Sequence, residues 1–352
     1  MKRLTLIILL LAIAMVARAY DLVVATPQGQ VLYYTITSSN TVKVVSGPTK
    51  PTGRLTIPST VQGYAVTEIA SMAFNGCTGL TSVSVPGSVT TIGMRAFAGC
   101  SALTSAIFAE GVRTFGSMVF SSCTSLDTIS LPTTITQLAT GCFGNTAIMT
   151  NPNRWQDSAL YVSHYLVAVR AARTGTLVVA DSTLGIASDA LDYCHISKCV
   201  LPAGLHFVGD MAFKDCTLLD TVRLLGITPP TLGSDSFQGT AASLIVAVPC
   251  NSATAYSAAQ YWSQFTIVED PCPTPPVSIT SVQANSIEAT ISGNTLRISG
   301  AEGQPLTVSD ITGRRIFSVA SANDNMRIDM PSTGVYIVSV GSAAPLKVCY
   351  LK

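Results

Sequence analysis

An interval of 23 residues separates repeated copies of one short motif, and this spacing constrains the fold more than any other feature. The motif Phe-x-x-Cys-x-x-Leu begins at Phe74, Phe97 and Phe120, and Phe143 follows after the same interval. Four to five apolar positions in each copy keep this spacing over four copies. A period of about 20–29 residues with regularly placed leucines is typical of a solenoid, in which each repeat forms one coil.

Each repeat divides into a strand and a return segment. Leu80–Pro86 and Leu126–Pro132 alternate apolar and small polar residues, a pattern that predicts a strand with one buried face. Proline ends each strand because it cannot donate to a β-ladder. One coil leaves its apolar edge uncovered, so we expect neighbouring coils to stack at about 4.8 Å. The sequence therefore predicts a mainly β solenoid.

The repeats are interrupted once and are closed at both ends. Residues 144–180 lose the period, which predicts a strand-rich insertion, and the pattern returns from Ile186 to Leu219. We expect the solenoid to cover residues 20–269, beginning with an N-terminal cap hairpin. Terminal repeats need a seal, and four aromatic residues are predicted to provide it at the C-terminal end: Tyr256, Tyr261, Trp262 and Phe265.

Two of the repeat units carry a family resemblance. LTSVSVPGSVTTIGMRAFAGC and VLPAGLHFVGDMAFKDC resemble the leucine-rich repeat of the BspA-like, treponemal-type surface proteins. The resemblance covers about residues 30–269. It implies a leucine-rich repeat solenoid that acts as a non-enzymatic adhesin or binding module. It also implies host matrix proteins or other bacterial cells as partners.

The N-terminus has the pattern of a secretory signal peptide at residues 1–19. Lys2 and Arg3 precede an apolar run of 13 residues, and small residues stand at Ala17 and Ala19. A transmembrane helix needs about 18 or more apolar residues, and no cysteine before Cys77 could carry a lipid. We expect a secreted mature chain that begins near residue 20 and has no transmembrane span.

The C-terminal part of the chain shows no 23-residue period. Residues 270–276 (DPCPTPP) predict a stiff, proline-rich linker. Short alternating segments in residues 277–352 are separated by Gly, Asn and Pro. This pattern predicts a small β-sandwich of about seven strands.

Parts of this region resemble the C-terminal sorting domain of the type IX secretion system of Bacteroidetes. The resemblance lies in Val308–Ser318, Gly334–Gly341 and the final KVCYLK, where Cys349 departs from the usual pattern. It implies that residues 277–352 address the protein to the secretion machinery, and that the chain is attached to the outer surface of a Gram-negative bacterium. The alternative is an ordinary adhesive sandwich.

Ten cysteines in a chain expected to be secreted raise the question of disulfides. Four of them share the repeat phase: Cys77, Cys100, Cys123 and Cys216. Their Cβ vectors should be parallel and point into the core, so we predict small buried side chains instead of bridges. Two pairs lie outside the phase or in irregular chain and are predicted as possible disulfides: Cys194–Cys199 and Cys250–Cys272.

No catalytic, metal or cofactor motif occurs in the sequence. Only three histidines are present, without HExxH, CxxC, GxSxG or a Walker-type loop. Lys and Arg total 20 against 19 Asp and Glu, so no net basic surface is available for nucleic acid. We expect neither an enzyme nor a cofactor. The alternatives are a surface-coat component without a specific ligand, and a hydrolase that would use Trp155, Asp157 and His164.

The candidate binding residues are the outward positions of the predicted strands. Solenoids bind ligands on extended faces formed by equivalent positions of successive coils. Ten positions make up this face: Ser82, Ser84, Ser105, Ile107, Thr128, Ser130, Lys198, Val200, Thr221 and Arg223. A shallow, hydroxyl-lined ribbon with few charges suits contact with a protein or glycan surface over a large area. The alternative is that these residues only solvate a sheet.

Overall fold

The computed structural model describes residues 20–272, 287–292, 294–331, 334–342 and 345–350. The chain divides between Asp270 and Pro271 into two compact units. The predicted signal peptide at 1–19 lies outside the described residues, as do positions 273–276 of the predicted linker and 277–286 of the predicted sorting domain.

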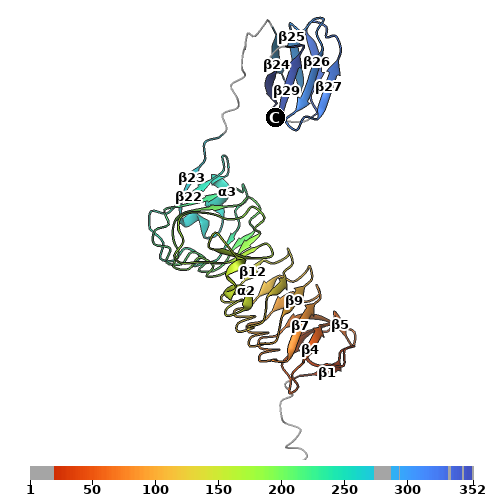
Figure 1. Cartoon of the computed structure of the whole chain (residues 1–352), viewed down its shortest axis with the longest axis vertical. Helices are drawn as coiled ribbons and strands as arrows, with labels where there is room; N and C mark the ends of the chain where they lie inside the picture. The colour runs from red at the N-terminus through yellow and green to blue at the C-terminus, as the bar shows by residue number, and fades with distance from the viewer. Residues whose placement is uncertain (1–19, 273–286, 293, 332–333, 343–344, 351–352) are drawn as a thin grey trace, which may run out of the picture. The chain divides into compact units, whose positions relative to one another are not determined.

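The first unit is a solenoid whose coils each contribute one strand to a major sheet and one to a minor sheet (Figure 1). The first major sheet is entirely parallel, in the order β11-β9-β7-β4. Its strands are β4 (Gly53–Thr56), β7 (Leu80–Val85), β9 (Ser105–Phe108) and β11 (Thr128–Ser130). The two-residue minor strands of the same coils are β8 (Thr91–Ile92), β10 (Thr114–Phe115) and β12 (Gln137–Leu138).

An antiparallel cap covers the N-terminal end of the solenoid. It consists of β1 (Leu22–Ala25), β2 (Val31–Ile36) and β3 (Thr41–Val45). β3 then pairs in parallel with β6 (Tyr64–Ile69), which carries the minor sheet on to β8. The two-residue strand β5 (Thr60–Val61) pairs with β6. The cap therefore gives the first coil a paired neighbour.

The insertion begins with helical turns and ends as part of the solenoid. Its first elements are α2 (Ala147–Thr150), η1 (Pro152–Arg154) and β13 (Trp155–Gln156). The hairpin of β14 (Ala159–Val162) and β15 (Tyr165–Val169) follows, and then β16 (Thr174–Val178). β15 pairs with the next minor strand and β16 with the next major strand. The coils thus resume before residue 180, although the sequence period does not.

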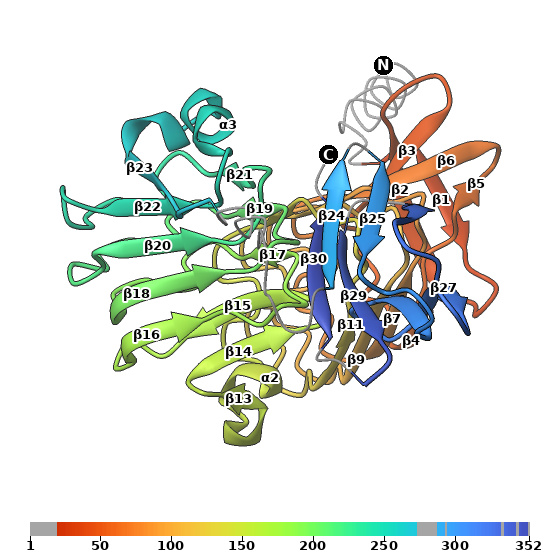
Figure 2. The same cartoon turned by 90° about the horizontal axis from the view of Figure 1, so that it is seen from above.

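The second half of the solenoid contains its own major sheet, in the order β16-β18-β20-β22-β23. These strands lie side by side in Figure 2. After β16, they are β18 (His195–Leu201), β20 (Thr221–Leu224), β22 (Ile245–Val248) and β23 (Thr266–Glu269). The minor strands are β17 (Gly185–Ile186), β19 (Phe207–Val208) and β21 (Thr231–Leu232). α3 (Ala253–Ala258) and η2 (Trp262–Gln264) connect β22 to β23.

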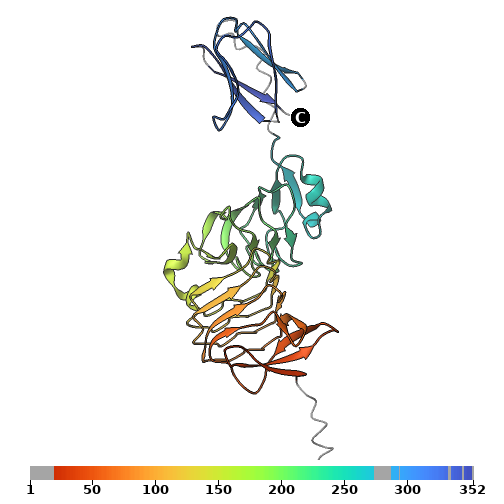
Figure 3. The same ribbon diagram turned by 90° about the vertical axis from the view of Figure 1, so that its right-hand side faces the viewer.

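One hydrophobic core runs through all of the coils, which follow one another along the solenoid in Figure 3. Phe97 stacks between Phe74 and Phe120, with ring centroids 5.1 and 5.7 Å apart. Phe120 continues the stack to Phe143 at 5.9 Å. The prediction that equivalent side chains of successive coils stack in register is confirmed, since these rings stack on one another and are all buried.

Aromatic residues close the C-terminal end of this core. Tyr256 and Trp262 are fully buried, and their polar atoms donate to Gly226 O and Pro230 O, each at 2.8 Å. Tyr261 instead remains exposed. The predicted seal is thus formed without Tyr261.

The repeated cysteines are free and buried, as predicted. Cys100 Sγ donates to Phe74 O at 3.2 Å, and Cys123 Sγ donates to Phe97 O at 3.0 Å. Burial raises the pKa of the Cys216 thiol to about 12. The repeated cysteines act in packing and in hydrogen bonding to the neighbouring coil.

The predicted Cys194–Cys199 disulfide is wrong, since both residues are free and buried thiols. Cys194 ends the coil before β18 and lies 3.7 Å from Val169 O in the preceding coil. Cys199 lies within β18 at a fully buried position. Each sulfur therefore fills its own place in the core. Cys250 and Cys272 of the other predicted pair are both disulfide-bonded.

The second unit consists of two antiparallel sheets over one small core. Within the described residues, one sheet contains β24 (Glu288–Ser292), β25 (Thr295–Ser299) and β28 (Met326–Asp329). The other contains β26 (Leu306–Asp310), β27 (Arg315–Val319), β29 (Gly334–Val340) and β30 (Leu346–Tyr350). Both sheets contribute to the core, for example through Ile298 and Val338. The predicted fold class, a solenoid followed by a small β-sandwich, is confirmed.

Candidate binding surface

The ten predicted residues lie at outward positions of the two major sheets, and strand register aligns them in rows. Ser82, Ser105 and Thr128 are direct neighbours across three strands. A second row holds Ser84, Ile107 and Ser130. In the second major sheet, Lys198 lies beside Thr221 and Val200 beside Arg223. The structure thus forms two separate surfaces, one on each sheet, and a role in binding remains a prediction.

The surface of the first sheet (the hydroxyl face) is lined mainly by serine and threonine. β4 extends its rows with Arg54 and Thr56, which sequence reasoning did not include. Ile107 is the one large aliphatic side chain in these rows, and it is 54% exposed. The side-chain hydroxyls of Ser82, Ser84 and Ser105 make no hydrogen bond to any described residue. These groups are free to donate to and accept from a ligand.

The surface of the second sheet (the aliphatic face) has a different composition. One row runs Val178, Val200, Arg223, Ala247 and Val268. Val178 is 63% exposed and Val268 is 46% exposed. Val178 adjoins Val200, whereas Val268 lies at the other end of the row beside Ala247.

The second row of the aliphatic face contains Thr176, Lys198, Thr221, Ile245 and Thr266. Ile245 is exposed, and Lys198 forms no ion pair with a described residue. Thr221 Oγ1 donates to Asp220 Oδ1 at 2.6 Å, so this hydroxyl is already engaged. The alternation in LIVAV (244–248) and TIVE (266–269) is a signal that could have identified Ile245 and Val268.

Arg223 is the one cation in the aliphatic row. Its Nη2 lies 2.8 Å from Asp270 Oδ2, just after β23. The pair is partly exposed, with 51% of the Arg223 side chain and 27% of the Asp270 side chain accessible. Arg223 therefore brings a compensated charge to this surface, and Lys198 brings an uncompensated one.

The residues of the hydrolase alternative have structural contacts in the insertion. Asp157 Oδ2 lies 2.8 Å from Arg173 Nη2. Trp155 Nε1 donates to Met149 O at 3.1 Å, and the Arg170 guanidinium lies 4.8 Å from the Trp155 ring centroid. These separate contacts of Asp157 and Trp155 stabilise the fold of the insertion. His164 is exposed.

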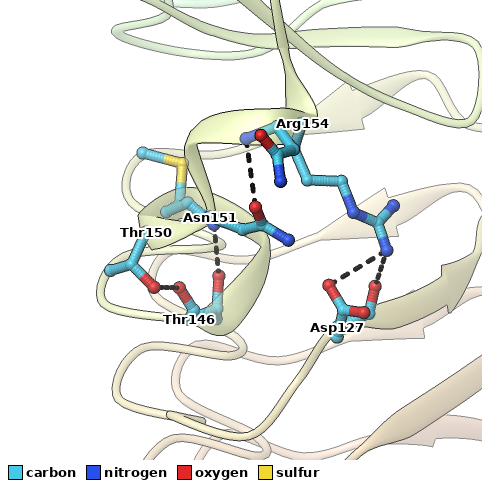
Figure 4. Close-up of polar contacts among 7 residues, drawn as sticks. Asp127, Thr146, Thr150, Asn151 and Arg154 are labelled. Atoms are coloured by element: carbon cyan, nitrogen blue, oxygen red, sulfur yellow. Dashed lines mark hydrogen bonds and ion pairs between the residues drawn. The ribbon is translucent and has the colours of Figure 1, made fainter.

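The start of the insertion is joined to the first major sheet. Figure 4 shows Arg154 reaching Asp127, whose Oδ1 lies 3.0 Å from Arg154 Nη2. Thr146 caps α2 by accepting from Met149 N at 3.3 Å, and Asn151 Oδ1 accepts from Asn153 N. These contacts fix α2 and η1 next to the start of β11.

The described residues contain no group of three or more His, Cys, Asp or Glu side chains that could hold a metal ion. No helix in the described part of the chain is long and apolar enough to cross a membrane.

The coils match a family model described as the BspA type leucine rich repeat region. Six copies match, over residues 53–158 and 176–270, which is more than half of the chain. The protein is therefore a leucine-rich repeat solenoid, and it belongs to the BspA-type leucine-rich repeat family. Residues 276–349 match a second model, described as a domain of unknown function (DUF6383).

Several solved structures are similar to the solenoid. A leucine-rich repeat protein of T. pallidum is 21% identical, over 66% of this chain and 84% of that one, with a TM-score of 0.30. A leucine-rich cell surface protein of Faecalibacterium prausnitzii is 17% identical, over 73% and 97%, with a TM-score of 0.27. The pneumococcal vaccine antigen PcpA is 13% identical, over 71% and 99%, with a TM-score of 0.25. No curated protein matches the chain significantly.

Proposed function

We propose that the protein is a secreted or cell-surface binding module that acts as a non-enzymatic adhesin. The observation that carries this proposal is the in-register rows of free hydroxyls on the first major sheet. Ser82, Ser84 and Ser105 offer donors and acceptors that no described residue uses. Repetition over several coils allows many weak contacts to add up on one partner.

The proposed partners are extracellular: host matrix proteins, or the protein and glycan surfaces of other bacteria. A hydroxyl-rich surface with one exposed aliphatic side chain, Ile107, suits polar contacts of modest individual strength. The aliphatic face adds a second surface with a larger apolar contribution. A coat protein without a ligand would show the same in-register rows, so the binding experiment separates the two functions.

A substitution series on the hydroxyl face tests this proposal. In the full chain, Ser84, Ser105 and Thr128 are changed together to Arg, and binding to immobilised matrix proteins and to bacterial cells is measured by surface plasmon resonance. We expect at least a tenfold loss of affinity, about 1.4 kcal/mol, because three long cations then stand across both rows.

The matched control places the same three charges in the same coils, at the turn residues Thr78, Ser101 and Thr124. These residues are exposed and lie outside the major sheet. The control should bind like the unchanged protein. Equal binding by both variants would rule out the hydroxyl face as the contact surface.

We also propose that residues 277–352 form a sorting domain for type IX secretion, which places the solenoid on the outer surface of a Gram-negative cell. The compact unit after Asp270 and its two antiparallel sheets support a separate domain. A chain that ends after Asp270 should fold but stay in the periplasm. Detection of that shortened chain on the cell surface would contradict the sorting role.

A further inference from the structure

Side chains bond to outward backbone groups on three of the four outer edges of the two major sheets. An uncovered edge strand presents backbone donors and acceptors to any other extended chain. On β4, the side-chain amide of Gln30 donates to Thr52 O at 2.7 Å and to Arg54 O at 2.6 Å. This amide occupies the place that the next strand would take.

On the two edges that face the insertion, arginine and serine side chains bond to outward backbone groups. Arg154 donates to Asp127 O at the start of β11, and Ser163 Oγ accepts from Leu131 N at 3.0 Å just after that strand. On β16, Arg173 donates to Thr174 O at 2.8 Å and to Thr176 O at 3.0 Å.

β23 forms the fourth edge, and no side chain of a described residue bonds to its backbone. Asp270 N donates to Val248 O at 2.7 Å, so alternate residues face β22, while the N–H and C=O groups of Ile267 and Glu269 face away from it. No described residue donates to or accepts from these outward backbone groups.

β23 carries one charged side chain, Glu269, and no lysine or proline. Natural edge strands often carry lysine or proline, which discourages pairing. β23 instead reads TIVE, with Thr266, Val268 and Glu269 exposed and Ile267 half-buried. Glu269 Oε1 accepts from Ala253 N at 2.7 Å, so its position is fixed while its charge has no cationic partner among the described residues.

We propose that β23 is a strand-addition site, at which an extended peptide of a partner protein joins the second major sheet as its next strand. The backbone groups of Ile267 and Glu269 that no described residue uses can pair with the backbone of an extended chain at this spacing. The peptide carries an aliphatic side chain beside Val268, and a lysine or arginine beside Glu269. This site lies at the edge of a sheet and is separate from the hydroxyl face of the proposed function.

A pair of synthetic peptides tests the proposal on the full chain. The first is a fluorescein-labelled strand of alternating threonine and valine that contains one lysine, made in both sequence directions. The second has glutamate in place of lysine. We expect the lysine peptide to bind at least tenfold more tightly in one direction. We also expect binding to slow hydrogen exchange at the amides of Ile267 and Glu269, which should exchange quickly in the free protein.

Two variants test whether the peptide binds at the β23 edge. Ile267→Pro removes an outward N–H without removing a bond to β22, and proline is tolerated at such edge positions. It should lower affinity for the lysine peptide at least tenfold. Glu269→Lys keeps the strand and should reverse the preference, so that the glutamate peptide binds more tightly.

Three results would overturn the proposal: no binding of either peptide, unchanged binding by both variants, or amides of Ile267 and Glu269 that are already protected without peptide. Protection that grows with protein concentration would assign the edge to a second copy of the chain instead. The Arg variants of Ser84, Ser105 and Thr128 should bind the lysine peptide normally, so the hydroxyl face and the β23 edge can fail independently.

Discussion

The two halves of the solenoid share an interior and differ on the outside. Phe97 stacks on Phe74 at 5.1 Å in the first half, and Phe213 stacks on Phe237 at 4.7 Å in the second. The outward rows, by contrast, are hydroxyl-rich on the first major sheet, whereas one of the two rows on the second is mainly aliphatic. The core sets the register of the coils, and this register leaves the outward positions free to vary.

A glycine at the corner of each coil shows how strongly the stacking of the coils constrains the sequence. A Cβ atom on Gly93 would lie 2.3 Å from Ser71 N, and one on Gly209 would lie 2.5 Å from Ser188 N. Both glycines face the backbone of the preceding coil, at equivalent places in the two halves. Close stacking therefore requires glycine there, whereas no such constraint acts on the outward face.

The largest expected effect tests whether the two interiors are equivalent. Phe97→Ala and Phe213→Ala each remove a fully buried ring that stacks on a ring of the next coil. Each should lower the free energy of unfolding by about 3–5 kcal/mol, measured by urea unfolding with circular dichroism. If Phe213→Ala cost less than a third of Phe97→Ala, the two interiors would not be equivalent.

A smaller effect is expected at the junction of the halves. Tyr165 is buried on β15, and its hydroxyl donates to Pro132 O at 2.7 Å, across the insertion. Tyr165→Phe leaves that carbonyl without its partner and should cost about 1–2 kcal/mol. The exposed Tyr193 is the control, since Tyr193→Phe should leave the thermal midpoint unchanged. A neutral Tyr165→Phe would show that the halves are joined by the core alone.

The smallest effect is expected on the surface. The Arg154 and Asp127 side chains are 42% and 51% exposed, so solvent screens their ion pair. Arg154→Ala should cost about 1 kcal/mol or less, with a smaller difference at high salt. Arg113→Ala, at an exposed arginine without an ion pair to a described residue, is the control. A cost above about 2 kcal/mol would mean that closing the β11 edge matters for stability.

Periodic features were predictable because each one repeats a local pattern. The stacked rings, the unbridged thiols of Cys100 and Cys123, and the burial of Trp262 followed from the 23-residue phase and from the need to seal the last coil. The two-sheet architecture of the second unit followed from short alternating segments. The error at Cys194–Cys199 has the same origin: Cys199 departs from the phase because it lies within a strand, not because it is bridged.

The aliphatic face could be predicted only in part. Val200 and Arg223 came from clear repeats, but Val178 lies in β16, where the period is absent. Its place beside Val200 depends on backbone pairing with a strand about 20 residues away. Pairing of this kind leaves no mark in local composition.

Sequence alone determined that the chain is a solenoid with a separate β-rich C-terminal part, because side-chain burial must repeat wherever coils stack. Tertiary structure decided which residues share a surface, how the insertion rejoins the coils, and which sheet edges are closed. Those features depend on hydrogen bonds between segments distant in sequence, such as Arg173 to the edge of β16 and Gln30 to the edge of β4. A single side chain can make such a bond at any sequence separation, so no periodic pattern predicts it.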